Sequence, residues 1–200
     1  MEKYKEVQNI IGTFLKSSDF KRRGNIFLNK KCGNWVYVGF QKSVSSKKDR
    51  AKFTINIGIC SSVLRKWLES NQVEFPTHLD DCHWRKRIGF FMPGNQDFWW
   101  EIDNDTISTV LARNVIAVLH EKVLPEVDKY ITDDRLEAVW LTGGSQGLTQ
   151  VERFIFLTTL LKVGGSRELP RIAAEFKAYS RGKPWQNTAF EHLAKLGDYE

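Results

Sequence analysis

The sequence predicts an α+β fold with an N-terminal helix, a four- to five-stranded antiparallel sheet and a helical C-terminal part. Segments with alternating or β-branched apolar residues are confined to the first half of the chain, and helical spacing of apolar residues precedes and follows them. Only short loops separate the predicted strands, so no parallel crossover can join them. Strands followed by helices favour an antiparallel sheet with helices packed on one face.

The N-terminal segment carries apolar residues at helical spacing from Tyr4 to Leu15, which predicts an amphipathic helix over about 2–16. A basic run follows this helix. Gly24 then predicts a turn into a first strand at 25–29.

Two further strands follow in order. Residues 35–41 are rich in aromatic and β-branched side chains and are apolar at successive positions, so we expect both faces of this strand to be partly covered. Residues 53–59 alternate strictly, with apolar side chains at the odd positions and Thr54, Asn56 and Gly58 at the even ones. This alternation predicts a half-buried antiparallel strand with its apolar face on a core.

The next segment combines a short helix, a loop and more strand pattern. Ser61-Ser62 caps the predicted short helix, and residues 71–81 form the loop. We expect residues 85–91 and 98–102 to pair as a second hairpin, connected by the turn residues 92–97.

From Asp105 onward the apolar spacing becomes helical, and Pro125 predicts that the first of these helices ends or kinks near His120–Leu124. A short helix is expected over 133–141. Thr149 and Glu152 have the spacing of a capping box that opens the next helix.

Two more helices are predicted, one from near Pro170 to near Gly182 and one over about 185–196. The glycine-rich stretch 143–147 is the best candidate for a boundary. We therefore expect residues 1–142 to form an α+β domain and residues 143–200 to form a helical extension packed on it.

Cysteine usage and hydropathy indicate a cytoplasmic protein. The three cysteines are an odd and sparse set, which is typical of reduced thiols. No apolar run reaches the length of a membrane span, and residues 1–6 lack the apolar segment of a secretory signal. We expect no membrane contact, and the sequence leaves the oligomeric state open.

The charge is distributed unevenly. Residues 1–100 carry 18 Lys and Arg against 9 Asp and Glu, whereas residues 101–200 carry 12 against 15. A basic half can steer a protein toward an acidic partner, either a protein or a nucleic acid. The alternative is a lysine-rich surface that is simply solvated.

Five short motifs occur in a fixed order between residues 19 and 100. They are Asp19-Phe20-Lys21-Arg22-Arg23-Gly24-Asn25-Ile26-Phe27, Gly39-Phe40-Gln41-Lys42-Ser43, Phe53-Thr54-Ile55-Asn56-Ile57-Gly58, Arg87-Ile88-Gly89 and Trp99-Trp100. Together they resemble a bacterial family known as domain of unknown function 4304. The resemblance covers about residues 5–130 and implies a small cytoplasmic bacterial protein without an established activity. Some members are thought to lie among toxin–immunity or defence genes.

A metal or cofactor site is not predicted. His78, Cys82 and His83 are close in sequence, but the chain lacks the paired short spacings of a structural zinc site. Adjacent side chains on a strand face opposite ways, so Cys82 and His83 would not converge on one ion.

A hydrolase with an unrecognised site is a weaker alternative. Asp80, Asp81 and Glu101 are the only carboxylates near the basic cluster, and Cys82 next to His83 could act as a nucleophile if nearby arginines lowered its pKa. Sequence neighbours on a strand seldom form the hydrogen bond that such a pair needs. The sequence therefore favours a non-catalytic protein.

Nucleic-acid binding is the first alternative function, because basic residues alternate with aromatic ones along the predicted strands. This arrangement can bind single strands by stacking and charge, although no recognised nucleic-acid signature is present. The residues concerned are Lys21, Arg22, Arg23, Lys30, Lys31, Lys42, Lys47, Lys48, Arg50, Arg85 and Arg87, with Trp35, Tyr37, Phe40, Trp84 and Trp99.

Protein binding is the favoured function. Trp, Tyr and Arg dominate interface hot spots, and an immunity protein blocks a toxin by charge complementarity without catalysis. We expect an acidic protein partner, of which a toxin is one candidate. Asn56 is expected either at this surface or bonded within the sheet. The predicted partner-binding residues are Trp84, Arg85, Arg87, Trp99, Arg22, Arg23 and Lys42.

Overall fold

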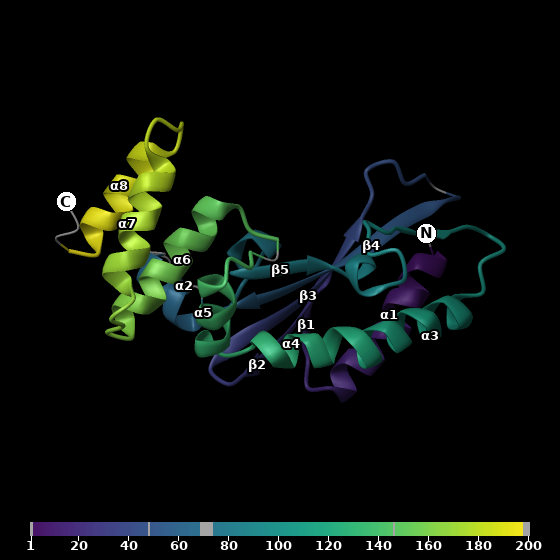
Figure 1. The fold of residues 1–200 in the computed structure, drawn as a ribbon. Coiled ribbons are helices and arrows are strands. Elements are labelled where there is room, and N and C mark those ends of the chain that lie inside the picture. Colours follow the sequence, from purple (N-terminus) through teal and green to yellow (C-terminus); the bar gives the residue numbers. More distant parts are fainter. Residues whose placement is uncertain (1, 48, 69–73, 146, 198–200) are drawn as a thin grey trace.

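A computed structural model describes residues 2–47, 49–68, 74–145 and 147–197. It confirms the α+β fold, with a helix first, an antiparallel sheet next and helices last. Figure 1 shows the sheet at the centre and the C-terminal helices gathered at one end of it. Lys48 and the loop residues 71–73, for which predictions were made, lie outside the described residues.

The sheet has six strands in the order β1-β2-β3-β4-β5, and β6 also pairs with β4. All pairs are antiparallel. Strand β1 was not predicted, because its three residues are basic and exposed and carry no apolar signal. The strands are β1 (Lys21–Arg23), β2 (Ile26–Lys31), β3 (Asn34–Lys42), β4 (Ala51–Cys60), β5 (Trp84–Arg87) and β6 (Trp100–Ile102).

The predicted second hairpin is wrong, because β5 and β6 pair with β4 and not with each other. Trp84 lies opposite Ile59 at one end of β4, and Ile102 lies opposite Ala51 at the other end. The two strands therefore run in the same direction along one edge of β4. Between them, residues 88–99 leave the sheet and return to it, beginning with the short helical turn η2 (Ile88–Phe91).

Gly89 allows this excursion to close on itself. A Cβ at Gly89 would lie 2.3 Å from the carbonyl oxygen of Gln96 and 2.7 Å from the backbone nitrogen of Phe98. Any side chain at this position would collide with backbone atoms, so the return path of residues 96–98 requires glycine here.

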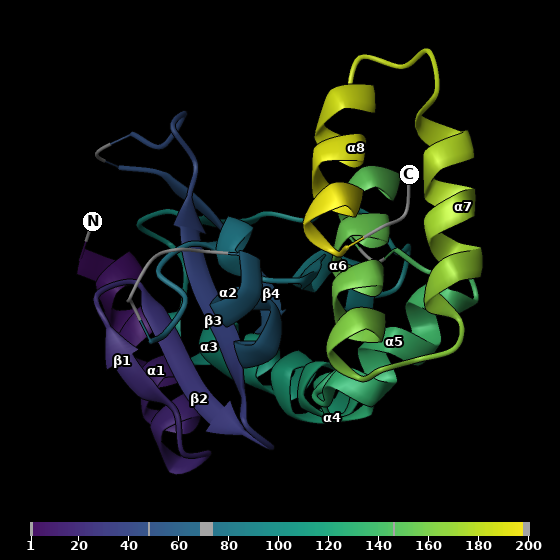
Figure 2. The same cartoon turned by 90° about the vertical axis from the view of Figure 1, so that its left-hand side faces the viewer.

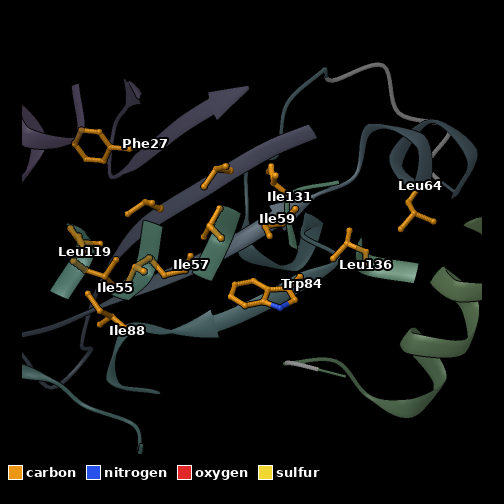
Figure 3. Packing of buried hydrophobic residues seen from close by; sticks show 14 of the residues in the cluster. Phe27, Ile55, Ile57, Ile59, Leu64, Trp84, Ile88, Leu119, Ile131 and Leu136 are labelled. Carbon is orange, nitrogen blue, oxygen red and sulfur yellow. The ribbon is translucent and has the colours of Figure 1, made fainter. Parts of the chain in front are cut away.

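One face of the sheet, called the helix-covered face below, is buried under helices. Phe53, Ile55, Ile57 and Ile59 of β4 are completely buried there, as the alternation predicted. Helices α1 (Glu2–Ser17) and α3 (Ser108–Val118) lie side by side on this face in Figure 1, and the ring of Tyr4 packs edge-on against Phe53 at 5.6 Å. Figure 3 shows the β4 isoleucines and Trp84 converging on the same core.

The opposite face, called the groove face below, carries the even residues of β4. Thr54 and Asn56 are buried there as well, so β4 is covered on both faces and is not half-buried as predicted. A second cluster of buried residues lies at one end of it, formed by Leu28, Tyr37, Cys60 and Cys82, with Leu79 packed against them. A Cβ on Gly58 would lie 2.5 Å from the sulfur of Cys82, so glycine leaves the space that this thiol fills. β3 is buried at most positions on both faces, as predicted.

Near Pro125 the sequence predicted that the helix ends or kinks, and the helix does not end but becomes irregular at the predicted place. It continues from α3 through a π-helical turn η3 (Leu119–Val123) into α4 (Leu124–Tyr130). Proline has no N–H and its ring would clash with the preceding turn. The wider π turn lies directly before it, so the chain keeps its helical path with a local irregularity.

The C-terminal helices are α5 (Asp133–Leu141), α6 (Gln150–Val163), α7 (Leu169–Ser180) and α8 (Gln186–Lys195), and α2 (Ser62–Leu68) packs beside them (Figure 2). The predicted capping box is confirmed: the Glu152 N–H donates to the Thr149 hydroxyl at 3.2 Å, and the Thr149 N–H donates to the Glu152 carboxylate at 2.8 Å. One core cluster extends from Tyr4 to Leu196, so these helices share the core of the sheet.

Arg153 at the start of α6 is a buried cation, and it illustrates how this helical part is tied together. Its guanidinium donates to the carbonyl of Trp140 at 2.5 Å. Trp140 lies in the last turn of α5. The partial negative charge at a helix C-terminus stabilises a cation there. None of the described helices is long and apolar enough to cross a membrane.

Candidate functional site

A groove of about 590 Å³ opens on the groove face of the sheet, beside β5. This volume lies within the range of ligand pockets. The walls come from four separate parts of the chain: β4, the turn around η1 (Leu79–Asp81), β5 with its excursion, and the glycine-rich connection before α6. The lining residues are Asn56, Leu79, Asp80, Arg85, Lys86, Arg87, Phe90, Asn95, Asp97 and Gly147.

Arg87 lies at the centre of a hydrogen-bond network in this groove. Its Nε donates to the Asn56 side-chain oxygen at 3.2 Å, and its Nη2 donates to the Gln41 side-chain oxygen at 3.4 Å. Its Nη1 donates to the Asp97 carboxylate at 2.6 Å. Asn56 in turn donates to Gln41 at 2.9 Å, so strands β3, β4 and β5 contribute to one network.

Trp99 completes this network at the end of the excursion. Its indole N–H donates to Asp97 at 3.1 Å, and the guanidinium of Arg87 lies 5.4 Å from the centre of its ring. Partial desolvation acts to raise the pKa of Asp97, but the hydrogen bonds from Arg87 and Trp99 outweigh it and the pKa is lowered. Asp97 is therefore an ionised group that accepts hydrogen bonds from the Arg87 and Trp99 side chains and from the backbone of Phe98.

Arg85, two residues before Arg87 on β5, points to the same face, but its hydrogen bonds connect parts of the fold. Its Nε donates to the Cys82 carbonyl at 2.8 Å, and its Nη2 contacts Glu152 at 2.5 Å. Glu152 also closes the capping box of α6, so Arg85 links β5 to the C-terminal helices. Asp80 lies 3.4 Å away on the exposed side.

Gly147 shows how closely the C-terminal connection approaches this strand. A Cβ at Gly147 would lie 2.2 Å from the carbonyl oxygen of Arg85, and its φ of +73° is in the left-handed region. Glycine satisfies both conditions. The predicted boundary thus also forms one wall of the groove.

The prediction that Trp84 contacts a partner is wrong for the folded chain, because the side chain is completely buried. It points to the helix-covered face, where its ring stacks on Tyr130 at 5.7 Å. Neighbouring residues on a strand face opposite ways, so Trp84 and Arg85 could not both line one surface.

The remaining predicted partner-binding residues do not form one surface. Arg22 and Arg23 lie on β1, at the edge of the sheet opposite β5. Arg22 donates to Asn9 and Gln8 of α1, whereas Arg23 lies 4.0 Å from the ring centre of Phe75. Lys42 ends β3. The structure therefore brings together Arg85, Arg87 and Trp99 and leaves the other cations apart.

The groups proposed for hydrolysis are not arranged as a reactive pair. Burial raises the pKa of the Cys82 thiol well above its ordinary value, so this thiol is a poor nucleophile. Burial, followed by the charge of Arg85, lowers the pKa of His83 to about 3, and its Nδ1 accepts from the Ser61 N–H at 2.9 Å. Glu101 lies on β6 and forms a cross-strand ion pair with Lys52 at 2.6 Å.

Asp81 has a local structural role. Asp81 accepts from the backbone N–H groups of Thr77 and His78, which makes it a cap for η1. Within the parts of the chain that the structure describes, no group of three or more His, Cys, Asp or Glu side chains is placed to hold a metal ion.

The aromatic side chains proposed to stack on bases are mostly inside the protein. Tyr37, Phe40 and Trp84 are buried, and only Trp35 and Trp99 are partly accessible. Several of the associated cations already form ion pairs with carboxylates of the same chain: Lys30 with Glu74, Lys31 with Asp128 and Arg50 with Glu101.

The relation to known proteins agrees with the motifs in the sequence. A family model described as domain of unknown function (DUF4304) matches residues 11–129, which is more than half of the chain. The chain belongs to this family. No curated protein and no solved structure matches the chain. The helices α5 to α8 lie beyond the DUF4304 match.

Residues of four DUF4304 motifs meet in the hydrogen-bond network of Arg87, and two of them, Asn56 and Arg87, line the groove. Gln41, Asn56, Arg87 and Trp99 come from four different motifs, and they form the network described above. Other motif residues have structural roles, as Gly58 and Gly89 show.

The contacts of Asp97, Glu152 and Gly147 with β5 were not predicted, although Glu152 was predicted in a capping box and Gly147 in the glycine-rich boundary. None of these residues belongs to a DUF4304 motif. The contacts are tertiary, and no local pattern reveals them.

Proposed function

We propose that this DUF4304 protein is a non-catalytic binding protein that takes an acidic segment of a partner protein into the groove. The single observation that carries the proposal is the convergence of Gln41, Asn56, Arg87 and Trp99, from four separated motifs, on one partly open network. We further propose that it acts in the bacterial cytoplasm. A toxin blocked by occlusion is the first partner class to consider, because occlusion needs complementary charge and no chemistry.

The composition of the groove supports a protein ligand. Arg85 and Arg87 project from adjacent same-face positions of one strand, and Phe90 in the groove wall is 39% exposed. Arginine beside an exposed aromatic ring is the composition of interface hot spots. Leu79 adds a second apolar wall, so a segment carrying both acidic and apolar side chains fits the chemistry of the groove.

The charges of the groove favour an acidic rather than a basic segment. Both strand arginines are fixed in place by hydrogen bonds to the protein, whereas their exposed carboxylates belong to connecting segments: Asp80 is 92% exposed and Asp97 is 46% exposed. An incoming carboxylate can take over such a pair, because exposed ion pairs contribute little stability. A basic segment would have to approach the two fixed cations.

Site-directed photocrosslinking in cells of the source organism tests this proposal. A photoreactive amino acid is placed at Asn95, which is exposed and lines the groove, and in the control at Val163, which is 52% exposed at the end of α6. We expect a protein adduct from position 95 and none of the same mass from position 163. The crosslinked peptide should be rich in Asp and Glu.

Purified components then give the quantitative step. Binding of the identified partner to Arg87→Gln should be at least about tenfold weaker than to the wild type, because a charge-assisted hydrogen bond is lost. A nuclease-sensitive adduct at position 95 would replace this proposal by the nucleic-acid alternative. Equal affinity of the wild type and Arg87→Gln would exclude the groove as the binding site.

A further inference from the structure

We infer that Arg87 and Trp99 form a receptor for a single carboxylate group, and that Asp97 fills this receptor as an internal stand-in for the ligand. The inference rests on the proposed function, because it names the chemical group that the groove recognises. It also identifies Asp97 as a residue that weakens binding in the free protein.

The guanidinium of Arg87 is held in a fixed direction by neighbouring side chains. Its Nε and Nη2 are oriented by the neutral side-chain oxygens of Asn56 and Gln41, both on regular strands. Neutral amides fix the direction of the guanidinium but do not cancel its charge. Only Nη1 carries a negatively charged partner, Asp97, among the contacts described for this side chain.

Two donors converge on one oxygen of Asp97. The Nη1 of Arg87 and the indole N–H of Trp99 both donate to the same oxygen of Asp97, at 2.6 and 3.1 Å. Two donors aimed at one oxygen form a geometry that suits a carboxylate from any source, and hydrogen bonds to a charged acceptor are the stronger kind.

Asp97 itself lies outside the strands that carry the network of Arg87. It lies in the irregular part of the excursion, three residues after Gly94 and two after Asn95, which have positive φ values of 95° and 45°. Its side chain is 46% exposed, so a ligand can reach it from solvent. The receptor is therefore built on strands, whereas its present occupant belongs to a turn-rich segment.

Arg85 provides the internal contrast. Of its two carboxylate partners, Asp80 is exposed but Glu152 is fixed by the capping box of α6, where both the N–H and the hydroxyl of Thr149 contact the carboxylate. Displacing Glu152 would disrupt the start of a helix, and displacing Asp97 would disrupt no regular element. Carboxylate recognition is therefore assigned to Arg87 and not to Arg85.

The test follows the indole N–H signal of Trp99 by ¹⁵N-correlated NMR while succinate is added at constant ionic strength. The chain has seven tryptophans, and Trp99→Phe assigns the signal. We expect succinate to bind Asp97→Asn at least about fivefold more tightly than the wild type, because the internal competitor of an exposed pair is removed. Succinamide, the neutral analogue, should produce no saturable shift in either protein.

Three variants make the result specific. Glu101→Gln is the matched control, because Glu101 is also an exposed ion-paired carboxylate, 44% exposed beside Lys52, and it is not part of the groove wall; it should behave as the wild type does. Asp97→Ala should bind succinate as tightly as Asp97→Asn does. It replaces Asp97→Asn as the test variant if the asparagine amide itself accepts hydrogen bonds from Arg87 and Trp99. Arg87→Gln combined with Asp97→Asn should abolish the saturable shift.

The inference is overturned if Asp97→Asn and Asp97→Ala bind succinate no better than the wild type, or if succinamide shifts the Trp99 signal equally. These outcomes are independent of any partner protein. Failure of the crosslinking experiment would therefore reject the proposed function without affecting the receptor, and failure here would reject the receptor without affecting the proposed function.

Discussion

The helix-covered face and the groove face of the sheet are built from alternate residues of the same strands, yet different kinds of structure lie over them. On the first, the odd residues of β4 are completely buried beneath α1 and α3. On the second, Asn56 and its neighbours contact turns, the 88–99 excursion and the Gly147 connection, and a groove remains. The same backbone therefore carries a continuous apolar core and a polar network.

The difference shows which part of the molecule is free to serve a function. Apolar burial of the helix-covered face supplies the larger share of stability, because each fully buried large side chain contributes about 1.5–3 kcal/mol. The hydrogen bonds of the groove face contribute much less, since polar groups exchange partners with water. Side chains on the groove face can therefore be arranged for recognition at little cost to folding.

Replacing Trp84 gives the largest expected difference in stability between the two faces. Trp84→Ala removes a fully buried ring from the helix-covered face, so the free energy of unfolding should fall by about 3–5 kcal/mol. Trp99→Ala, the matched change on the groove face, should lower it by less than about 1.5 kcal/mol. Urea denaturation followed by circular dichroism measures both. Similar losses for the two variants would contradict the assignment of the two faces.

The sequence patterns revealed the helix-covered face more completely than the groove face. Strict alternation over 53–59 predicted the buried side of β4, because apolar side chains with period two require one covered face. The pairing of β5 and β6 was predicted wrongly because alternation identifies a strand but not its neighbour. The ten residues of β4 provide an edge long enough for both strands.

The groove was predictable only in part. Arg85, Arg87 and Trp99 were identified from the density of cations and tryptophans, but Trp84 was included with them, although it faces the core. The contacts of Asp97 and Glu152 with β5 were not predicted, because they are tertiary contacts. Only the folded chain shows that Arg85 also holds a fixed carboxylate, Glu152, whereas the carboxylate described beside Arg87 is exposed.

The second prediction concerns pH and compares two buried histidines, His83 and His192, with the exposed carboxylate of Asp97. Burial lowers the pKa of His83 to about 3 and, together with Lys195, lowers that of His192 to about 4, against an ordinary value of 6.5. Both histidines are neutral in the fold and protonate first in the unfolded chain. Stability is therefore complete above pH 6.5 and falls as the pH drops toward the folded values, by about 1.4 kcal/mol per pH unit for each histidine.

Urea midpoints measured between pH 7 and pH 5 check this slope, and His192→Gln should remove about half of it. The NMR signal of Trp99 should change little over the same range, because the pKa of Asp97 lies below its ordinary value of 3.8. Constant stability between pH 7 and pH 5 would show that the histidines are not buried as described.

The third prediction tests the close approach of the C-terminal connection to the groove. Gly147→Ala should lower the free energy of unfolding by about 1–3 kcal/mol more than Gly143→Ala does. Both positions have positive φ, +73° and +87°, so both variants carry backbone strain. Only Gly147 has a neighbouring carbonyl within 2.2 Å of the added Cβ, and Gly143 has nothing within 4 Å. Thermal unfolding of the two variants isolates this contact, and equal losses would argue against it.

The smallest expected effect distinguishes the two arginines of β5. Arg85→Gln should lower the free energy of unfolding by about 1–3 kcal/mol, because its side chain is 14% exposed and its loss leaves Glu152 and the Cys82 carbonyl without this donor. Arg87→Gln should lower it by less than about 1 kcal/mol, because Asn56 and Gln41 keep their own hydrogen bond and Asp97 is close to solvent.

Urea denaturation of these two variants, measured together with succinate binding in the Asp97→Asn background, joins the stability argument to the recognition argument. If Arg87 contributes little stability but is required for carboxylate binding, its three-strand network of amides cannot be explained by folding alone. If Arg87→Gln is instead the more damaging of the two, the network is a structural feature of the sheet. The groove face would then differ from the helix-covered face only in being polar.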